Sequence, residues 1–165
     1  MRYFLLGLPG SGKSHWGKIW ARETRNSFFD LDEVIENNEG ESIKNIFKTE
    51  GEDHFRNLES FYLNKLIDNY HGLVLSTGGG TPCFNENLKL MASAGKTIFL
   101  NPPIEDIASR VWKPETNERP MFNQCKSKQE AFRVLEDLKT KRIIYYEQAN
   151  IILERWDENI IKKIK

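Results

Sequence analysis

An eight-residue segment near the start of the chain has the spacing of a phosphate-binding loop. Residues 7–14, GLPGSGKS, fit the pattern G-x-x-x-x-G-K-[ST]. The apolar run from Tyr3 to Leu6 predicts a buried strand before the loop, and the chain from Lys13 onward predicts a helix after it. In that context glycine-rich backbone and the positive end of the helix can both face phosphates. We therefore expect Lys13 to reach the β- and γ-phosphates of a nucleotide and the Ser14 hydroxyl to ligate the accompanying Mg²⁺.

Two aspartates follow the second apolar run, Phe28 and Phe29. Asp30 and Asp32 share one face if the strand continues through them. The alternative is helix capping, since Asp30 with Glu33 three residues later fits a capping box. Capping explains one aspartate well and the second poorly. We therefore favour a functional role for both, at the carboxyl end of a strand where open α/β sheets bind ligands.

A third apolar run, residues 73–77, is typical of a strand buried in a parallel sheet, and it leads into three glycines, residues 78–80. Many phosphate-loop proteins end this strand with an aspartate that orders Mg²⁺, and none stands here. Asp30 is the nearest candidate for that role. The glycines permit a ligand to approach the backbone closely, although a flexible connector fits the local pattern nearly as well.

Residues 33–71 predict a mostly helical insertion with breaks around residues 38–42 and at Gly51. Its apolar stripe at helical spacing is Phe55, Leu58, Tyr62, Leu63, Leu66, Ile67 and Tyr70. Arg56 and Glu59 lie off this stripe, and Glu52 stands four residues before Arg56. On the residues alone we favour a surface ion pair worth roughly 0.2–0.5 kcal/mol.

Residues 113–120 are polar and broken by proline, which predicts a loop. Arg110 precedes this loop and Arg119 lies within it. In a nucleotide-binding domain this pattern is typical of a lid that carries positive charge towards phosphates. An ordinary solvated loop explains the pattern about as well.

Strands are further predicted at residues 97–100 and 151–153, and helices at 13–25, 85–94, 104–112, 127–148 and 157–164. Five strands alternating with helices predict a doubly wound parallel α/β sheet. With 165 residues the chain suffices for one domain. We expect Trp16 and Trp20, on the first helix, to be packing residues and His15 to be exposed.

Composition excludes several classes of protein. The chain has 24 basic and 24 acidic residues and no basic run with interleaved aromatics, so nucleic acid is not an expected partner. No segment approaches the roughly 18 apolar residues of a membrane span, so we expect a cytoplasmic protein without membrane contact. The two cysteines and three histidines lack disulfide or metal-ligand spacing. Nothing requires more than a monomer.

The order of these motifs resembles the shikimate kinase family over nearly the whole chain. The features that carry the resemblance are GLPGSGKS at 7–14, FFDLDEVIE at 28–36, SIKNIF at 42–47, GEDHFRNLE at 51–59, STGGGTP at 76–82, Arg110, ERP at 118–120 and RIIYYEQA at 142–149. The phosphate loop is common to many nucleotide enzymes, whereas the combination of all these motifs is specific.

The resemblance implies a P-loop three-layer sandwich of the nucleoside monophosphate kinase type, with a parallel sheet in the order 2-3-1-4-5. It implies transfer of the ATP γ-phosphoryl group to the 3-hydroxyl of shikimate, with Mg²⁺ as cofactor, in the pathway to aromatic amino acids. The substrate-binding segment would span about 31–62 and the lid about 111–124 of a single domain, residues 1–165.

The resemblance also assigns roles to individual positions. The catalytic residues would be Lys13, Asp32 and Arg119. The shikimate contacts would be Asp32, Arg56, Gly79, Gly80 and Arg142. The nucleotide contacts would be Gly10, Ser11, Gly12, Lys13, Ser14, His15, Arg110 and Arg119, and the Mg²⁺ partners Ser14 and Asp30. Shikimate carries a carboxylate and three hydroxyls, which suit the guanidinium groups of Arg56 and Arg142 and the Asp32 carboxylate.

The chain departs from the family pattern in three places. His15 replaces a small hydroxyl residue, residues 121–122 are Met-Phe where smaller aliphatics are commoner, and the segment after Leu153, where the family contacts adenine, is short. The alternatives are a phosphate-loop kinase for another small hydroxy acid such as gluconate, or for a nucleotide, and a nucleotide-binding module without catalysis.

Overall fold

The computed structural model describes residues 1–112, 122, 125–156 and 158–164. The strands are β1 (Arg2–Leu6), β2 (Ser27–Asp30), β3 (Leu73–Ser76), β4 (Lys96–Leu100) and β5 (Ile151–Leu153). The helices are α1 (Lys13–Thr24), α2 (Leu31–Glu39), α3 (Ile43–Thr49), α4 (Gly51–Asn69), α5 (Asn87–Ala94), α6 (Ile104–Val111), α7 (Lys128–Tyr146) and α8 (Glu158–Ile164), with a 3₁₀ turn η1 (Thr81–Cys83).

The five strands form one sheet in the order β2-β3-β1-β4-β5. Each neighbouring pair is parallel, with Phe4 of β1 opposite Leu75 of β3 and Thr97 of β4. Parallel strands need crossover connections, which the intervening helices supply. The predicted strand order and all-parallel sheet are confirmed.

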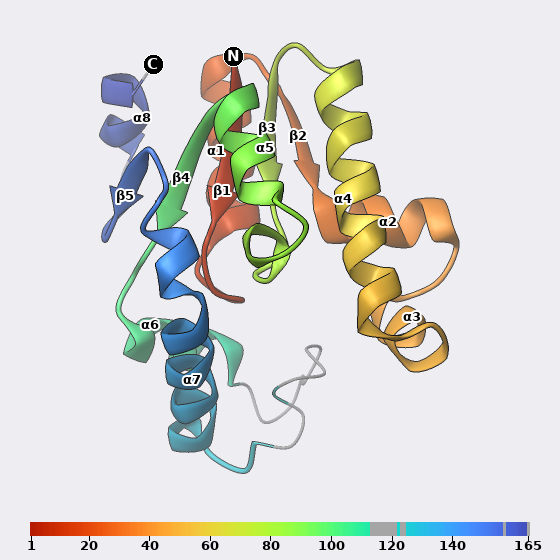
Figure 1. The fold of residues 1–165 in the computed structure, drawn as a ribbon. Coiled ribbons are helices and arrows are strands. Elements are labelled where there is room, and N and C mark those ends of the chain that lie inside the picture. Colours follow the sequence, from red (N-terminus) through yellow and green to blue (C-terminus); the bar gives the residue numbers. More distant parts are fainter. Residues whose placement is uncertain (113–121, 123–124, 157, 165) are drawn as a thin grey trace.

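Side-chain alternation along β1 separates two apolar layers. Tyr3 and Leu5 pack on one face with Trp20 of α1, in a cluster that also contains a residue of α8. Phe4 and Leu6 point to the other face, into the larger cluster built with α4, α5 and α7. The sheet is therefore the middle of three layers, with α1 and α8 on one side and α5 on the other (Figure 1).

Helices α2, α3 and α4 form the predicted helical insertion beside β2 and β3 (Figure 1). The breaks stand where they were predicted: α2 ends before Gly40, and α4 begins at Gly51, whose φ of 85° favours glycine. The Tyr62 hydroxyl on α4 donates to Glu39 Oε1 on α2 at 2.6 Å. This contact joins α2 to α4 within the helical insertion.

The strand at residues 27–30 is shorter than predicted. β2 ends at Asp30, and α2 begins at Leu31, so Asp32 lies in the first turn of a helix and not in a strand. Asp30 Oδ1 accepts a hydrogen bond from the Asp32 backbone N–H at 3.1 Å, which makes Asp30 the N-cap of α2. The strand does not continue through Asp32, so the two aspartates do not share a strand face, and the capping alternative accounts for Asp30.

Three further predictions concern a membrane span, the lid and the two cysteines. In the described part of the chain, no helix is long and apolar enough to cross a membrane. Most of the predicted lid, residues 111–124, lies outside the described residues, and so does Arg119. Cys83 and Cys125 are both free thiols.

Candidate active site

The loop between β1 and α1 has the backbone of a phosphate cradle. Gly10 and Gly12 have φ values of 84° and 99°, which residues with a Cβ rarely adopt. The buried Lys13 Nζ donates to the carbonyl oxygens of Gly7 at 2.9 Å and Leu8 at 3.0 Å. The ammonium group therefore lies against the loop itself, beside the N-terminus of α1.

Ser11 supplies an independent sign that this loop fits an anion. Its side-chain oxygen is buried, and it has no hydrogen-bond partner among the described residues. A buried hydroxyl without a partner costs free energy, so such groups are uncommon and call for an explanation. A phosphate oxygen in the loop would provide the missing partner.

Three elements bring hydroxyl and carboxylate oxygens together at the base of the loop. Ser14 Oγ, on α1, donates to Asp30 Oδ2 at the end of β2 at 2.5 Å. It also lies 3.2 Å from Ser76 Oγ at the end of β3. Such hard oxygen groups suit Mg²⁺, which usually takes one or two protein ligands and completes its shell with water and phosphate. Among the described residues, no group of three or more His, Cys, Asp or Glu could hold a metal ion.

Charged side chains from α2, α4 and α7 meet at the glycine turn after β3, residues 78–80. A Cβ atom built on Gly78 would lie 2.7 Å from Glu59 Oε1 and 3.1 Å from Asp32 Oδ1. The first distance is shorter than real Cβ contacts and the second is tighter than most of them, so the carboxylates of α2 and α4 lie directly against this backbone. Any side chain at residue 78 would meet these carboxylates, which favours glycine at this position. The flexible-connector alternative does not explain why the carboxylates lie so close.

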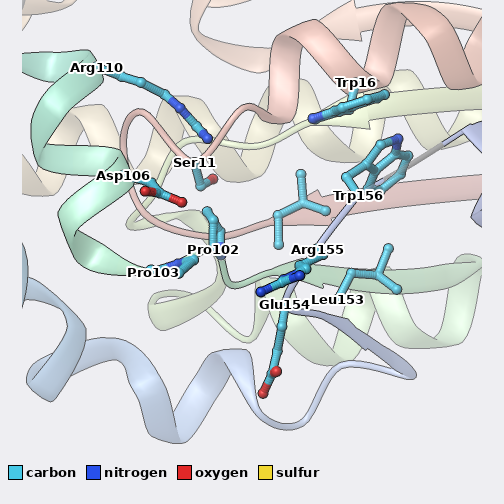
Figure 2. Close-up of a pocket in the computed structure, with 11 residues that line it drawn as sticks. Ser11, Trp16, Pro102, Pro103, Asp106, Arg110, Leu153, Glu154, Arg155 and Trp156 are labelled. Atoms are coloured by element: carbon cyan, nitrogen blue, oxygen red, sulfur yellow. The ribbon is translucent and has the colours of Figure 1, made fainter.

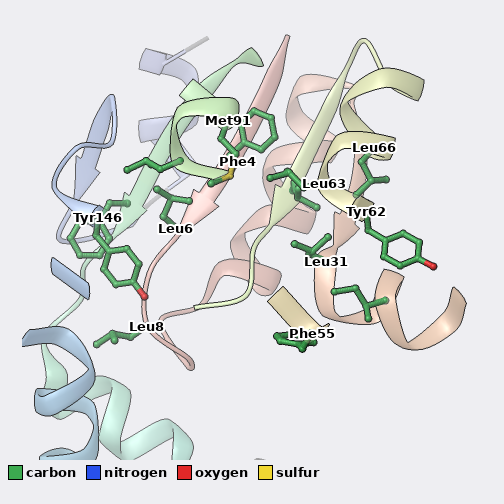
Figure 3. Packing of buried hydrophobic residues seen from close by; sticks show 14 of the residues in the cluster. Phe4, Leu6, Leu8, Leu31, Phe55, Tyr62, Leu63, Leu66, Met91 and Tyr146 are labelled. Carbon is green, nitrogen blue, oxygen red and sulfur yellow. The ribbon is translucent and has the colours of Figure 1, made fainter. Parts of the chain in front are cut away.

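The next two glycines are approached by two guanidinium groups. A Cβ atom on Gly79 would lie 2.8 Å from Arg142 Nη1, and one on Gly80 would lie 2.6 Å from Arg56 Nη1. The Tyr146 hydroxyl, one turn after Arg142 on α7, donates to the Gly79 carbonyl oxygen at 2.6 Å. Figure 3 shows Tyr146 in the apolar cluster near Leu6 and Leu8, so α7 is joined to the glycine turn through the core.

Arg56 is not the surface residue that its spacing predicted. Its exposed fraction is 9% and that of Glu59 is 0%. The ion pair with Glu52 exists, at 2.9 Å, but a second and shorter one joins Arg56 Nη1 to Glu59 Oε2 at 2.7 Å. The prediction of a simple surface pair is wrong, because tertiary packing covers this face of α4 with the turn at 78–80.

Glu59 is a site residue that the sequence did not reveal. It accepts hydrogen bonds from Arg56 and from the Thr81 hydroxyl. Burial raises the pKa of Glu59, and Arg56 opposes that rise. Burial alone would lower the pKa of Arg56, but its pairing with Glu59 and Glu52 raises the pKa overall. Two signals were available: the i, i+3 spacing of Arg56 and Glu59 on a helix, and the place of Glu59 at the end of the motif at 51–59.

The surroundings of Asp32 make its carboxylate a stronger base than that of an ordinary aspartate. Burial, followed by the charges of Asp30 and Glu59, raises the pKa of Asp32 to about 6. Lys13 opposes this rise, so the phosphate-loop ammonium and the Asp32 carboxylate lie close enough to interact. The phosphate loop and the cluster at the glycine turn are therefore adjacent. At neutral pH the carboxylate is mainly ionised yet more basic than an ordinary aspartate.

A pocket of about 370 Å³ adjoins the phosphate loop (Figure 2). Its lining comes from the loop, from α1, from the β4–α6 connection, from α6 and from the segment after β5. The residues are Ser11, Trp16, Leu100, Pro102, Pro103, Asp106, Arg110, Leu153, Glu154, Arg155 and Trp156. The short segment after Leu153 thus lines a pocket whose size is typical of small-molecule sites.

Arg110 and His15, both predicted to contact the nucleotide, point to different surroundings. Arg110 extends from α6 towards the phosphate loop (Figure 2), whereas His15 is exposed and its ring packs edge-on against Trp16. Trp20 is fully buried, as expected of a packing residue. Trp16 instead lines the pocket, and its ring centroid lies 5.2 Å from that of Trp156. The sequence did not identify Trp16 and Trp156 as neighbours, because 140 positions separate them.

The fold and site together define a class of protein. A phosphate loop with Mg²⁺-suited oxygens faces a second cluster that contains a strengthened base and two guanidinium groups. This arrangement is that of a phosphate-loop kinase for a small anionic acceptor that carries hydroxyl groups.

Comparison with known proteins identifies the family. The shikimate kinase family model matches residues 9–164. The shikimate kinase of Azobacteroides pseudotrichonymphae is 38% identical over 151 residues, which cover 92% of this chain and 88% of that protein. The shikimate kinase of Clostridium botulinum strain Okra is 36% identical over 163 residues, covering 98% and 92%. The chain belongs to the shikimate kinase family.

Solved structures agree with this assignment. The shikimate kinase of Bacteroides thetaiotaomicron has a TM-score of 0.88 at 34% identity, covering 99% of this chain and 93% of that one. The shikimate kinase of Acinetobacter baumannii, solved in complex with shikimate, has a TM-score of 0.84 at 30% identity, covering 99% and 89%.

Proposed function

We propose that this protein transfers the γ-phosphoryl group of Mg²⁺-ATP to the 3-hydroxyl of shikimate. The observation that carries the proposal is the convergence of Asp32, Arg56, Glu59 and Arg142 on the turn at residues 78–80, next to Lys13 of the phosphate loop. The solved Acinetobacter baumannii relative is a complex with shikimate, which supports the choice of acceptor.

The acceptor would bind through its carboxylate and its hydroxyls. Arg56 and Arg142 come from different helices and approach adjacent glycines, so their guanidinium groups can grip one small acid between them. Gly79 and Gly80 leave space for these two guanidinium groups to lie directly against the backbone. Glu59 does not need to touch the acceptor, since its buried carboxylate already orients Arg56.

Asp32 would orient the attacking hydroxyl and accept its proton. A positioned base contributes about 10²–10⁴ to a rate, and a pKa of about 6 brings Asp32 closer to the optimum than an ordinary aspartate. Its proximity to Lys13 supports a position of the acceptor hydroxyl near the β- and γ-phosphates, which phosphoryl transfer would require.

The donor side would stabilise charge on the phosphates. Lys13 and the N–H groups of residues 10–14 would hold the phosphates, with Arg110 at the base pocket and Arg119 closing from the lid. Ser14 and Asp30 would hold Mg²⁺, which when bound neutralises developing charge on the phosphate oxygens. We further propose that the enzyme works as a cytoplasmic monomer.

A coupled assay of ADP formation tests the function. Purified protein with Mg²⁺-ATP should release ADP in the presence of shikimate, and ³¹P NMR should detect a phosphomonoester product. Gluconate and nucleoside monophosphates serve as competing acceptors. Faster turnover with either would replace the proposed acceptor, and nucleotide binding without any turnover would support a non-catalytic module.

A further inference from the structure

Phe84, in the loop after η1, lies against the guanidinium group of Arg56. The Arg56 Cζ atom is 4.3 Å from the centroid of the Phe84 ring, compared with 5.3 Å for Phe55 and 6.0 Å for Phe47. Phe47 and Phe55 belong to the same helical insertion as Arg56. Phe84 is therefore the ring that joins this guanidinium group to the β3 side of the site.

The loop that carries Phe84 is anchored to the helix turn that carries Arg56. Asn85 Nδ2 donates to the Arg56 carbonyl oxygen at 3.1 Å and lies 3.1 Å from Ser60 Oγ. Asn85 and Glu86 both adopt left-handed conformations, with φ values of 50° and 58°. Asparagine tolerates this region, but glutamate rarely adopts it, so the tertiary contacts hold the backbone in a conformation that is locally unfavourable.

The remaining contacts of Arg56 explain why its orientation matters. Its Nε and Nη2 donate to Glu52 Oε1, and its Nη1 donates to Glu59 Oε2. Counting only bonds to described residues, three of the five guanidinium N–H groups are used and one is left on each terminal nitrogen. Both remaining groups can donate to an acceptor carboxylate only if the guanidinium plane keeps its orientation. An aromatic face attracts a guanidinium group and restricts its rotation.

We propose that Phe84 is a positioning residue for the acceptor: its ring face holds the Arg56 guanidinium group in the orientation that binds the acceptor carboxylate. This inference rests on the proposed function, because it takes shikimate as the acceptor. Phe84 acts through Arg56, so its loss weakens ground-state binding of the acid and leaves the chemistry of transfer intact.

Steady-state kinetics of three variants tests the proposal. Phe84→Ala should raise the KM for shikimate roughly three- to tenfold, with kcat within about twofold and the KM for ATP unchanged. Phe84→Tyr retains the aromatic face and should behave like the wild type. Phe84→Leu retains apolar bulk without that face and should resemble the alanine variant. A native KM for Phe84→Ala or Phe84→Leu would overturn the proposal.

Phe61→Ala is the matched control. Phe61 is exposed on α4, and its ring also lies near a cation, Lys65, at 6.0 Å. This variant should leave both KM values unchanged. If it raises the shikimate KM as much as Phe84→Ala does, loss of any exposed phenyl group has that effect and the specific role of Phe84 is refuted.

A double-mutant cycle shows whether Phe84 acts through Arg56. In an Arg56→Lys background, Phe84→Ala should have little further effect on the shikimate KM, because the planar group is already gone. An undiminished effect would mean that Phe84 contacts the acceptor itself.

NMR gives a readout that does not depend on turnover. The ring current of Phe84 should shift the Arg56 Hε resonance, which Arg56→Lys identifies by its loss. The shift should be retained in Phe84→Tyr and lost in Phe84→Leu; a resonance unmoved by Phe84→Leu would refute the contact. Wild-type protein that does not turn over shikimate would refute the proposed function, and these shifts would still report on the contact.

Discussion

Replacing Asp32 by asparagine should weaken catalysis and at the same time stabilise the metal-free protein. Asparagine keeps the size of the side chain and one acceptor oxygen but cannot accept the hydroxyl proton. We expect kcat to fall by at least roughly a hundredfold while the affinity for shikimate falls only modestly. Asp30, and not Asp32, is the N-cap of α2, so this substitution leaves the cap in place.

The stability gain follows from the raised pKa of Asp32. A rise of the pKa from 3.8 to about 6 means that the folded protein binds this proton more tightly than the unfolded chain does. The folded state therefore loses stability as the pH rises from about 4 to above 6. At 1.36 kcal/mol per pH unit, the full penalty at neutral pH is about 3 kcal/mol.

Two effects reduce that figure. Asp32 is only partly buried, so water screens part of the penalty, which leaves about 1–2 kcal/mol. A negative charge in the first turn of α2 interacts favourably with the helix dipole, and asparagine forfeits about 0.3–1 kcal/mol of that. The net gain of Asp32→Asn at neutral pH is therefore about 1 kcal/mol, or roughly 2–4 °C in Tm for a chain of this length.

Thermal unfolding by circular dichroism, in buffer with EDTA, checks this difference. Asp32→Asn should melt higher than the wild type at pH 8, and its advantage should shrink at pH 5, where the wild-type carboxyl group is largely protonated. An equal or lower Tm at pH 8 would refute the electrostatic account. So would an advantage that does not change with pH, and a native kcat would end the catalytic role.

Three further substitutions test other parts of the site. Arg119→Ala should lower kcat by at least roughly a hundredfold while calorimetric ATP affinity changes little, and an unchanged kcat would make the lid arginine a solvated residue. Alanine fits the backbone at residue 80, where φ is −91°, but the added Cβ of Gly80→Ala would displace Arg56. The shikimate KM should therefore rise on the order of tenfold, and a native KM would contradict this. Glu59→Gln should lower the free energy of unfolding by about 1–3 kcal/mol in a urea titration, and a native midpoint would show that the buried pair with Arg56 is not stabilising.

The sequence by itself determined the features that depend only on residues close together along the chain. The pattern at residues 7–14 predicted a strand, a phosphate loop and a helix, because glycine spacing and apolar runs act locally. The breaks in the insertion were predicted for the same reason: Gly51 adopts a φ that other residues avoid. Alternating apolar strands and amphipathic helices were enough to predict the parallel sheet.

Tertiary structure decided which charged side chains belong to the site. Arg56 and Glu52 have the spacing of a surface pair, and only the packing of the turn at 78–80 against α4 buries Arg56 with Glu59. Trp16 meets Trp156, and Phe84 meets Arg56, across long separations in the chain. No local pattern encodes such contacts, because burial and charge pairing depend on which segments the fold brings together. For the same reason the sequence does not reveal that burial and the charges of Asp30 and Glu59 raise the pKa of Asp32.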